Sequence, residues 1–367
     1  MTALAAVRGD RAARVAWARL VEPGDREVAA RIAAVGAEEA LQSIGADTVA
    51  SARMAGRLPD LDVDRDFQVA HKLGARIVVP GDDEWPQGFG DLAAPPVCLW
   101  LHGAADLGEA AVRSVSIVWA RAATGYGIHM AKDLAAGLAE RDFAVVSGAA
   151  YGIDGAAHEG ALAVDGVTIA FVAGGIERPY PSGHAGLLAR IRETGLVVSE
   201  VPPGSAPTKW RFLSRNRLIA TLTQGTVVVE AGLRSGSRNT ARLAGDHLRV
   251  LCAVPGPVSS AVSAGCHELI RAGATLVTDA AEVAEEVGPI GELAPHKEGL
   301  PAPGDDLGPS HQAVLAALPS RKAVTAEDLA RRCGLAAHEV RGALGVLDVA
   351  GLALREGDGW RKPAVRR

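Results

Sequence analysis

Basic side chains are concentrated in one stretch of the chain, between Lys209 and Arg249. This stretch holds eight lysines and arginines but only two acidic residues, whereas the whole chain has a formal net charge of −5. Its centre is the run Arg215-Asn216-Arg217, which stands directly before an apolar segment. A local cluster of positive charge on an acidic protein attracts polyanions through a patch rather than through overall charge. The stretch therefore predicts a polyanion-binding edge.

Three side chains are candidates for acid–base chemistry. Asp154 and His158 are one helical turn apart and could form an acid–base pair, although Asp154 also suits the first turn of a helix. Glu230 follows a predicted strand, where it could act as a catalytic carboxylate or accept hydrogen bonds from an opposing loop. The sequence contains neither a clear nucleophile–base spacing nor a P-loop. We therefore predict a phosphate-binding site without catalytic residues and without a cofactor.

The elements that must position these residues follow a regular pattern between residues 112 and 287. Predicted strands alternate with predicted helices, and they cover residues 114–119, 143–147, 167–173, 196–200, 226–230, 250–254 and 274–277. This alternation is typical of βαβ units, which form a parallel sheet with helices on both faces. The predicted fold class is therefore α/β, with an extended Rossmann-like parallel sheet.

Glycine and hydroxyl residues follow several of these strands. The loops in question cover residues 120–127, 147–154, 174–175, 180–183, 230–232 and 235–237. Ligands of open α/β sheets bind outside the carboxyl ends of the strands, where backbone N–H groups and helix dipoles favour phosphates. The loops therefore predict a phosphate-binding rim. A dinucleotide site is not supported, because Met130 stands where the Gly125-x-Gly127 motif would need a third glycine.

The segments that precede and follow the Rossmann-like domain in the sequence predict further domains. Residues 1–70 form short helices, either a DNA-contacting module like a helix-hairpin-helix or SAM domain, or a packing and partner-binding module. Residues 71–288 form the Rossmann-like domain, and residues 289–308 are an acidic linker rich in proline and glycine. Residues 309–367 have the element order of a winged helix and hold ten basic and six acidic residues. This last module could bind duplex DNA or dock a protein.

Composition excludes several other classes of protein. The four cysteines have no C-x-x-C spacing and do not cluster with histidines, so we predict no metal site and free thiols in a reducing cytoplasm. We find no signal peptide and no apolar stretch of the roughly 18 residues that span a membrane. Aromatic residues make up 4% of the chain. We therefore expect that aromatic stacking does not dominate any nucleic-acid site.

A set of specific motifs occurs in a fixed order along the predicted Rossmann-like domain, from about Ile77 to Val277. The ensemble resembles the DNA processing protein A family (DprA, also called Smf). The motifs are Ser147-Gly148-x-Ala150-Tyr151-Gly152-Ile153-Asp154, Tyr180-Pro181, Ser199-Glu200, Phe212-x-x-Arg215-Asn216-Arg217, Val229-Glu230-Ala231, Arg234-Ser235-Gly236-Ser237, Pro255-Gly256-Pro257-Val258 and Gly265-Cys266-His267.

The resemblance implies a non-catalytic function. Proteins of this family bind and protect incoming single-stranded DNA and help to load the RecA recombinase during natural transformation and homologous recombination. They commonly form homodimers through the Rossmann domain. The resemblance and the rim together predict contacts to single-stranded DNA from ten residues, namely Arg121, Ser147, Gly148, Lys209, Arg215, Asn216, Arg217, Ser235, Gly236 and Ser237.

The chain departs from the family pattern at two positions. The first loop usually begins Val-Gly-Ser/Thr-Arg, whereas this chain has Trp119 in place of the glycine. The indole would crowd a ligand at this loop, or else offer a face on which a base could stack. The second position is Ser182, where the family often has lysine, so one phosphate contact is expected to be lost.

An enzyme that acts on a nucleotide or nucleoside phosphate is the alternative function, because related Rossmann-like families use similar loops. Glu230 would then be the acid or base. The Pro-Gly-Gly-x-Gly-Thr run of the lysine-decarboxylase-like phosphoribohydrolases is absent from the sequence, and its absence favours the DNA-binding function.

Overall fold

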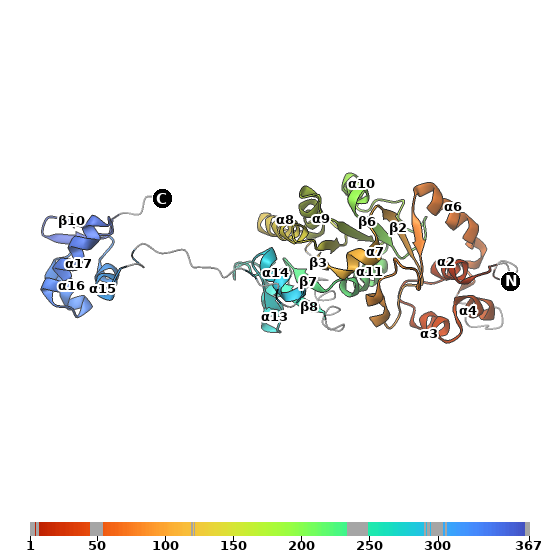
Figure 1. Cartoon of the computed structure of the whole chain (residues 1–367), viewed down its shortest axis with the longest axis horizontal. Coiled ribbons are helices and arrows are strands. Elements are labelled where there is room, and N and C mark those ends of the chain that lie inside the picture. The colour runs from red at the N-terminus through yellow and green to blue at the C-terminus, as the bar shows by residue number, and fades with distance from the viewer. Residues whose placement is uncertain are drawn as a thin grey trace. The chain divides into compact units, whose positions relative to one another are not determined.

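The computed structural model describes residues 4, 7–44, 54–118, 120, 122–232, 249–289, 291, 294, 304 and 307–363. The chain divides into two compact units, which cover Met1–Pro295 and His296–Arg367 (Figure 1). The first unit holds the large sheet and the N-terminal helices. The second unit holds the C-terminal helices and a short hairpin.

The described part of the first unit contains a nine-stranded sheet with the order β1-β2-β6-β5-β4-β3-β7-β8-β9. The six strands that follow β3 all run parallel to it, so the predicted Rossmann-like parallel sheet is confirmed. Only β2 runs in the opposite direction in this sheet, because it is antiparallel to both β1 and β6. The strands are β1 (Arg76–Val78), β2 (Leu99–Gly103), β3 (Ser114–Val118), β4 (Ala144–Ser147), β5 (Thr168–Val172), β6 (Leu196–Ser199), β7 (Gly225–Val228), β8 (Val250–Ala253) and β9 (Thr275–Leu276).

Helices cover both faces of this sheet (Figure 1). One face packs on α8 (Gly125–Ala139), α9 (Ile153–Ala163), α10 (Ala185–Thr194) and α14 (Ala280–Val287). The other face packs on α7 (Leu107–Val112), α11 (Lys209–Leu222) and α13 (Ala264–Arg271). Successive side chains of a strand point to opposite faces, so Ile117 enters the first of these cores and Val118 the second.

The order of the strands reverses at β3. Strands β4, β5 and β6 follow on one side of β3, and β7, β8 and β9 follow on the other. The connections that follow β3 and β7 therefore lead to strands on opposite sides of this pair. Such a switch point is where open α/β sheets bind ligands.

The N-terminal helices form a core of their own and also pack against the sheet. They are α2 (Asp10–Leu20), α3 (Arg26–Val35), α4 (Ala37–Ser43) and α6 (Val63–Leu73). Trp17 is fully buried in this core, and its Nε1 donates to Ala37 O at 3.0 Å. Val15 and Ala70 pack on Trp100 of β2, which attaches the helices to that side of the sheet.

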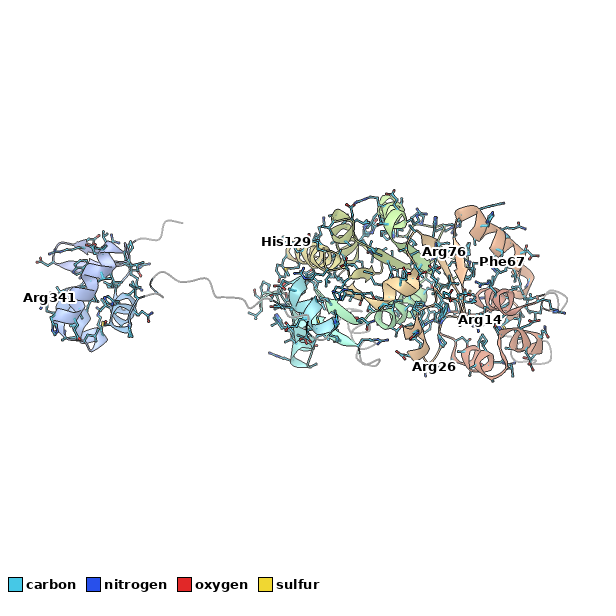
Figure 2. All side chains as sticks on the ribbon, viewed as in Figure 1. Arg14, Arg26, Phe67, Arg76, His129 and Arg341 are labelled. Atoms are coloured by element: carbon cyan, nitrogen blue, oxygen red, sulfur yellow. The ribbon has the colours of Figure 1, made fainter. Side chains whose placement is uncertain are left out.

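Arg76 fixes the first strand to the second (Figure 2). Its Nη1 donates to Gly103 O at 2.7 Å, and its Nε donates to Glu84 Oε2 at 3.0 Å. The hydrogen bond to Glu84 raises the pKa of Arg76 further, although partial burial opposes this shift. The guanidinium therefore holds a strand of only three residues in the sheet.

The second unit has the element order predicted for a winged helix. It contains α15 (Pro309–Ala317), α16 (Ala326–Cys333), α17 (Ala337–Val349) and a hairpin of β10 (Leu354–Glu356) and β11 (Gly359–Arg361). Thr325 caps α16 by accepting a hydrogen bond from Asp328 N at 3.2 Å, as its sequence predicts. Val314, Leu329 and Leu344 are fully buried in the core between the three helices.

Among the described residues, no helix combines the length and the apolar character needed to cross a lipid bilayer. The same residues contain no group of three or more His, Cys, Asp or Glu side chains placed to hold a metal ion.

Candidate nucleic-acid interface

The predicted site residues that the structure describes all belong to two neighbouring segments. Ser147 and Gly148 stand at the end of β4, and Lys209 and residues 215–217 belong to α11. Arg121, Ser235, Gly236 and Ser237 lie outside the described residues, as does Trp119. The described part of the site is therefore the junction between the loop after β4 and α11.

Arg215 lies in the protein interior beneath the loop after β4. The residue is 6% exposed, and its Nη1 donates to Gly148 O at 2.8 Å and also to Phe171 O. A Cβ atom at position 148 would overlap the guanidinium, so only glycine permits this approach. Arg215 thus joins α11 to two strand ends. Its contribution to DNA binding remains a prediction.

Arg217 is also buried, and its partner is the carboxylate of Glu200. Burial raises the pKa of Glu200, and the adjacent guanidinium opposes the shift. The loop between α2 and α3 covers this pair, because a Cβ atom at Gly24 would lie 3.7 Å from Arg217 Nε. Asn216 between the two arginines is 6% exposed. The centre of the predicted basic cluster therefore packs inward, and a direct phosphate contact from it remains a prediction.

The solvent-exposed charge at this edge comes from neighbouring residues. Lys209 is exposed at the first position of α11, where the Thr208 hydroxyl caps the helix by accepting from Arg211 N at 3.3 Å. Arg178 is exposed in the loop after β5, with 64% of its side chain open to solvent. Arg178 is not among the residues predicted from the sequence, although its place between a strand and Tyr180-Pro181 could have indicated it.

Arg211 is tied to the N-terminal helices instead of facing solvent. Its Nε and Nη2 both lie 2.9 Å from the carboxylate oxygens of Glu22, which also pairs with Arg57. Partial burial raises the pKa of Glu22, but the hydrogen bonds from Arg211 and Arg57 outweigh burial and lower it overall. An acidic residue of the N-terminal helices thus neutralises one of the cations of α11.

The loop after β4 has an unusual backbone. Ala149 has a φ of 55° and Gly152 a φ of 84°, and α9 begins directly after them. Ala150 N donates to Asp154 Oδ2 at 3.3 Å, so Asp154 stabilises the loop from the first turn of α9. Ser147 Oγ is buried and donates to Ile117 O at 2.6 Å, which ties β4 to β3. Backbone N–H groups are therefore what this loop offers a ligand, rather than the serine hydroxyl.

Glu230 connects the two loops at the switch point of the sheet. The residue is 2% exposed, and its carboxylate accepts hydrogen bonds from Thr124 N at 3.0 Å and from Thr124 Oγ1. The same threonine caps α8 by accepting from Gly127 N at 3.1 Å. A Cβ atom at Gly127 would overlap the carboxylate of Glu230. Of the two alternatives that the sequence left open, the hydrogen bond to the opposing loop is the one observed.

His158 is fully buried and faces the sheet. Its Nδ1 lies 2.7 Å from Thr168 Oγ1, which donates to Val145 O and therefore accepts from the imidazole. Burial lowers the pKa of His158 to about 3, with a smaller effect from His184 and Arg215. The ring is neutral at pH 7, and its contact with Thr168 identifies a structural histidine.

Several helices of the first unit begin at this same edge. Among them are α8, α9, α10 and α11, which follow β3, β4, β5 and β6. The N-terminus of each helix presents N–H groups and the positive end of the helix dipole, both of which favour anions. Together with Lys209 and Arg178 they make the carboxyl edge of the sheet suited to a chain of phosphates.

Comparisons with known proteins agree with this architecture. The sequence profile of the DNA recombination-mediator protein A family matches residues 76–288, and that of the DprA winged helix domain matches residues 298–359. A DprA homologue from Mycobacterium tuberculosis is 47% identical over 363 residues, which cover 94% of this chain and 93% of that protein. The DNA processing protein DprA of Streptococcus pneumoniae is 39% identical over 205 residues, which cover 56% and 72% of the two chains.

Solved structures of similar proteins give the same assignment. The S. pneumoniae DprA structure has a TM-score of 0.65 and 32% identity, covering 75% of this chain and 96% of that one. A Helicobacter pylori DprA, whose structure was described for its single-stranded DNA binding mode, has a TM-score of 0.52 and 28% identity, covering 58% and 95%. This chain therefore belongs to the DNA recombination-mediator protein A family, whose members carry the names DprA and Smf.

Proposed function

We propose that this protein binds single-stranded DNA along the carboxyl edge of its sheet, protects the strand, and helps to load RecA in transformation and recombination. In this proposal it acts in the cytoplasm, without catalysis, as a homodimer formed through the Rossmann-like domain. The protein need not read the sequence of the strand, because contacts to phosphates carry no sequence information. The DNA-binding structure of the H. pylori relative supports the choice of ligand.

The observation that carries the proposal is the arrangement around the loop after β4. The charged guanidinium of Arg215 donates a hydrogen bond to Gly148 O, and α9 begins at Ile153, at the end of the same loop. A buried cation in a medium of low polarity and the positive end of a helix dipole add in the same direction. This edge can therefore attract an anionic backbone even though the whole chain is acidic.

The cations that the structure describes at this edge divide into two groups in this proposal. Lys209 and Arg178 neutralise phosphates directly, since both are exposed at the carboxyl edge. Arg215 and Arg217 support the surface from below by holding the loop after β4 and the end of β6. Arg121, Ser235, Gly236 and Ser237 remain proposed contacts on the strength of the family resemblance and the rim.

The alternative of a nucleotide-processing enzyme would require an available acid or base. Both carboxylate oxygens of Glu230 accept hydrogen bonds from Thr124, and the imidazole of His158 is hydrogen-bonded to Thr168. We therefore propose that Glu230 organises the loops at the switch point, and that the site binds rather than converts its ligand.

The direct test is a salt titration of binding to a labelled oligonucleotide. Affinity should fall with salt at a slope of about −0.7 per phosphate neutralised. Lys209→Ala should flatten this slope by about 0.7. The matched control is Lys72→Ala, because Lys72 is equally exposed but stands at the end of α6, immediately before the amino end of β1. The proposed surface would be contradicted if the affinity did not change with salt concentration, or if the two variants had equal salt slopes.

A further inference from the structure

The exposed aromatic side chains that the structure describes all lie on the carboxyl side of the sheet. Among the described residues, the exposed Tyr, Trp and Phe side chains are Tyr126, Tyr151, Tyr180 and Trp210, which are 42%, 51%, 47% and 59% exposed. They include all three tyrosines of the chain. Large aromatic rings open to water need an explanation when they gather on one surface.

Each of these rings lies in the segment that leads from the carboxyl end of one strand to the helix after it, or in the first turn of that helix. Tyr126 comes after β3, Tyr151 after β4, Tyr180 after β5, and Trp210 after β6 at the start of α11. These four strands are consecutive neighbours in the sheet. Neighbouring strands are about 4.8 Å apart, so the loops that carry the rings succeed one another along the carboxyl edge at short intervals.

Tyr126 belongs to a different part of the edge from the other three. Its hydroxyl donates to Pro255 O at 2.7 Å, and Pro255 follows β8 on the far side of the switch point. Tyr151, Tyr180 and Trp210 all follow strands on the near side, and we call these three residues the aromatic row. The row occupies the same edge as the phosphate-binding surface proposed above.

Neighbouring side chains hold two rings of the row in place. The ring of Tyr151 packs edge-on against His184, with centroids 4.7 Å apart and an interplanar angle of 77°. The ring of Tyr180 packs on Phe212 with centroids 5.5 Å apart. Gly183 makes room for Tyr151, because a Cβ atom there would lie 2.6 Å from its hydroxyl oxygen. The rings are thus positioned by contacts that still leave about half of their surface open.

Cations alternate with these rings in the sequence. Lys209 directly precedes Trp210, and Arg178 stands two residues before Tyr180, and all four side chains are exposed. Surfaces that bind single strands combine charges that follow the backbone with aromatic rings on which bases stack. Phosphates and bases alternate along a strand in the same way, so the surface offers a partner to each.

We propose that Tyr151, Tyr180 and Trp210 form a platform on which unpaired bases of single-stranded DNA stack, an inference that rests on the proposed function. The stacking is tolerant of sequence, because every base has a π-face. The low aromatic content led us to expect that stacking would not dominate. The chain has few aromatic residues, but the exposed ones that the structure describes lie on the carboxyl side of the sheet, where we propose that the ligand binds.

The test compares two labelled ligands of equal length and charge, an oligothymidylate and an oligomer of abasic deoxyribose phosphates. The wild-type protein should bind the oligothymidylate more tightly by roughly 5- to 150-fold for each base that stacks. Replacing all three rings by leucine should bring the two affinities together and leave the salt slope unchanged. Tyr151→Phe and Tyr180→Phe are the matched controls, because they retain the ring and should retain the preference for bases.

Trp210 supplies an independent readout. Its fluorescence should be quenched when oligothymidylate binds, and Trp210→Phe should lose this quenching while it keeps most of the affinity. Because the three residues are exposed, the leucine variants should unfold at the wild-type temperature, and each single variant can be measured if the triple variant does not.

The outcomes separate this inference from the function on which it rests. If the abasic oligomer binds as tightly as oligothymidylate, the platform is refuted but the phosphate-binding surface stands. If neither ligand binds, the proposed function fails and the platform fails with it. If the leucine variants keep their preference for bases but change in sedimentation, the row is an interface between copies of the chain, and the platform is refuted.

Discussion

The guanidinium of Arg215 and the carbonyl oxygen of Gly148 are joined by a 2.8 Å hydrogen bond across 67 positions of sequence. The bond connects α11 to the loop that introduces α9, so two of the helices that begin at the carboxyl edge are fixed to each other. Because the same guanidinium also reaches Phe171 O, the ends of β4 and β5 are held by one side chain. The geometry of the proposed DNA surface therefore depends on a residue that is almost entirely covered.

Arg215→Met should destabilise the protein because it preserves much of the buried side-chain length and removes the donors. Gly148 O and Phe171 O would then lose a charged partner in the interior, which costs about 2 to 4 kcal/mol in the free energy of unfolding. Urea denaturation measures this loss. Gly148→Ala should weaken DNA binding as well, since the new methyl group overlaps the guanidinium. Wild-type stability of Arg215→Met would contradict the bonding described here.

Glu230→Ala should loosen the switch point. It leaves Thr124 N and Thr124 Oγ1 without their buried acceptor, and we expect a loss of about 2 to 3 kcal/mol in the free energy of unfolding. Glu230→Gln retains one acceptor oxygen, so its loss should be smaller, about 1 kcal/mol. Thermal or urea unfolding of the two variants checks this order.

The same glutamate variants test the absence of catalysis. Incubation of the wild-type protein with nucleoside monophosphates should release no free base, as measured by chromatography. Release that disappears in Glu230→Gln would instead support the enzymatic alternative.

Glu22→Gln should increase the affinity for single-stranded DNA at low salt. The carboxylate of Glu22 now neutralises Arg211, which is two residues from Lys209. Without that charge, Arg211 can contribute to binding and steepen the salt slope by up to about 0.7. Stability should fall only slightly, by about 0.5 to 1 kcal/mol, because the pair is partly exposed. Glu39→Gln is the control, since it removes the same charge from the exposed surface of α4; equal effects of both variants would show a general charge effect only.

His158 makes stability depend on pH in a defined direction. Burial lowers the pKa of its imidazole from 6.5 to about 3, so between these values the unfolded chain binds a proton that the folded protein does not. The contribution is therefore complete above pH 6.5 and is lost as the pH falls toward 3, at up to about 1.4 kcal/mol per pH unit. His158→Gln cannot titrate, and a series of urea denaturations should show a flatter pH dependence. An unchanged slope would show that the histidine is protonated in the folded protein.

Much of the fold follows from local patterns, whereas the arrangement of the site does not. The alternation of strands and helices after residue 112 predicted the parallel sheet, and Thr325 predicted the start of α16. The direction of β2 was not predictable, because an apolar run has the same sequence pattern in a parallel and an antiparallel strand. Arginine is usually exposed, so the burial of Arg215 could be known only once Gly148 was placed beside it.

The exposed aromatic residues illustrate a second limit of the sequence. Tyr151 and Tyr180 were visible as parts of motifs, but a ring beside a strand end can point inward or outward with the same local sequence. Their common edge becomes clear only from the order of the strands, which places the ends of β4, β5 and β6 side by side. Composition averages over the whole chain and cannot reveal such a gathering.

The two edge strands of the sheet affect how copies of the chain can associate. β1 has three residues and β9 has two, and each pairs with one neighbour only. Short edge strands present few unpaired backbone N–H and C=O groups, so they disfavour the strand-to-strand pairing that leads to aggregation. A homodimer of this protein would therefore be joined by side chains, and its contacts could diverge between relatives without any change to the sheet itself.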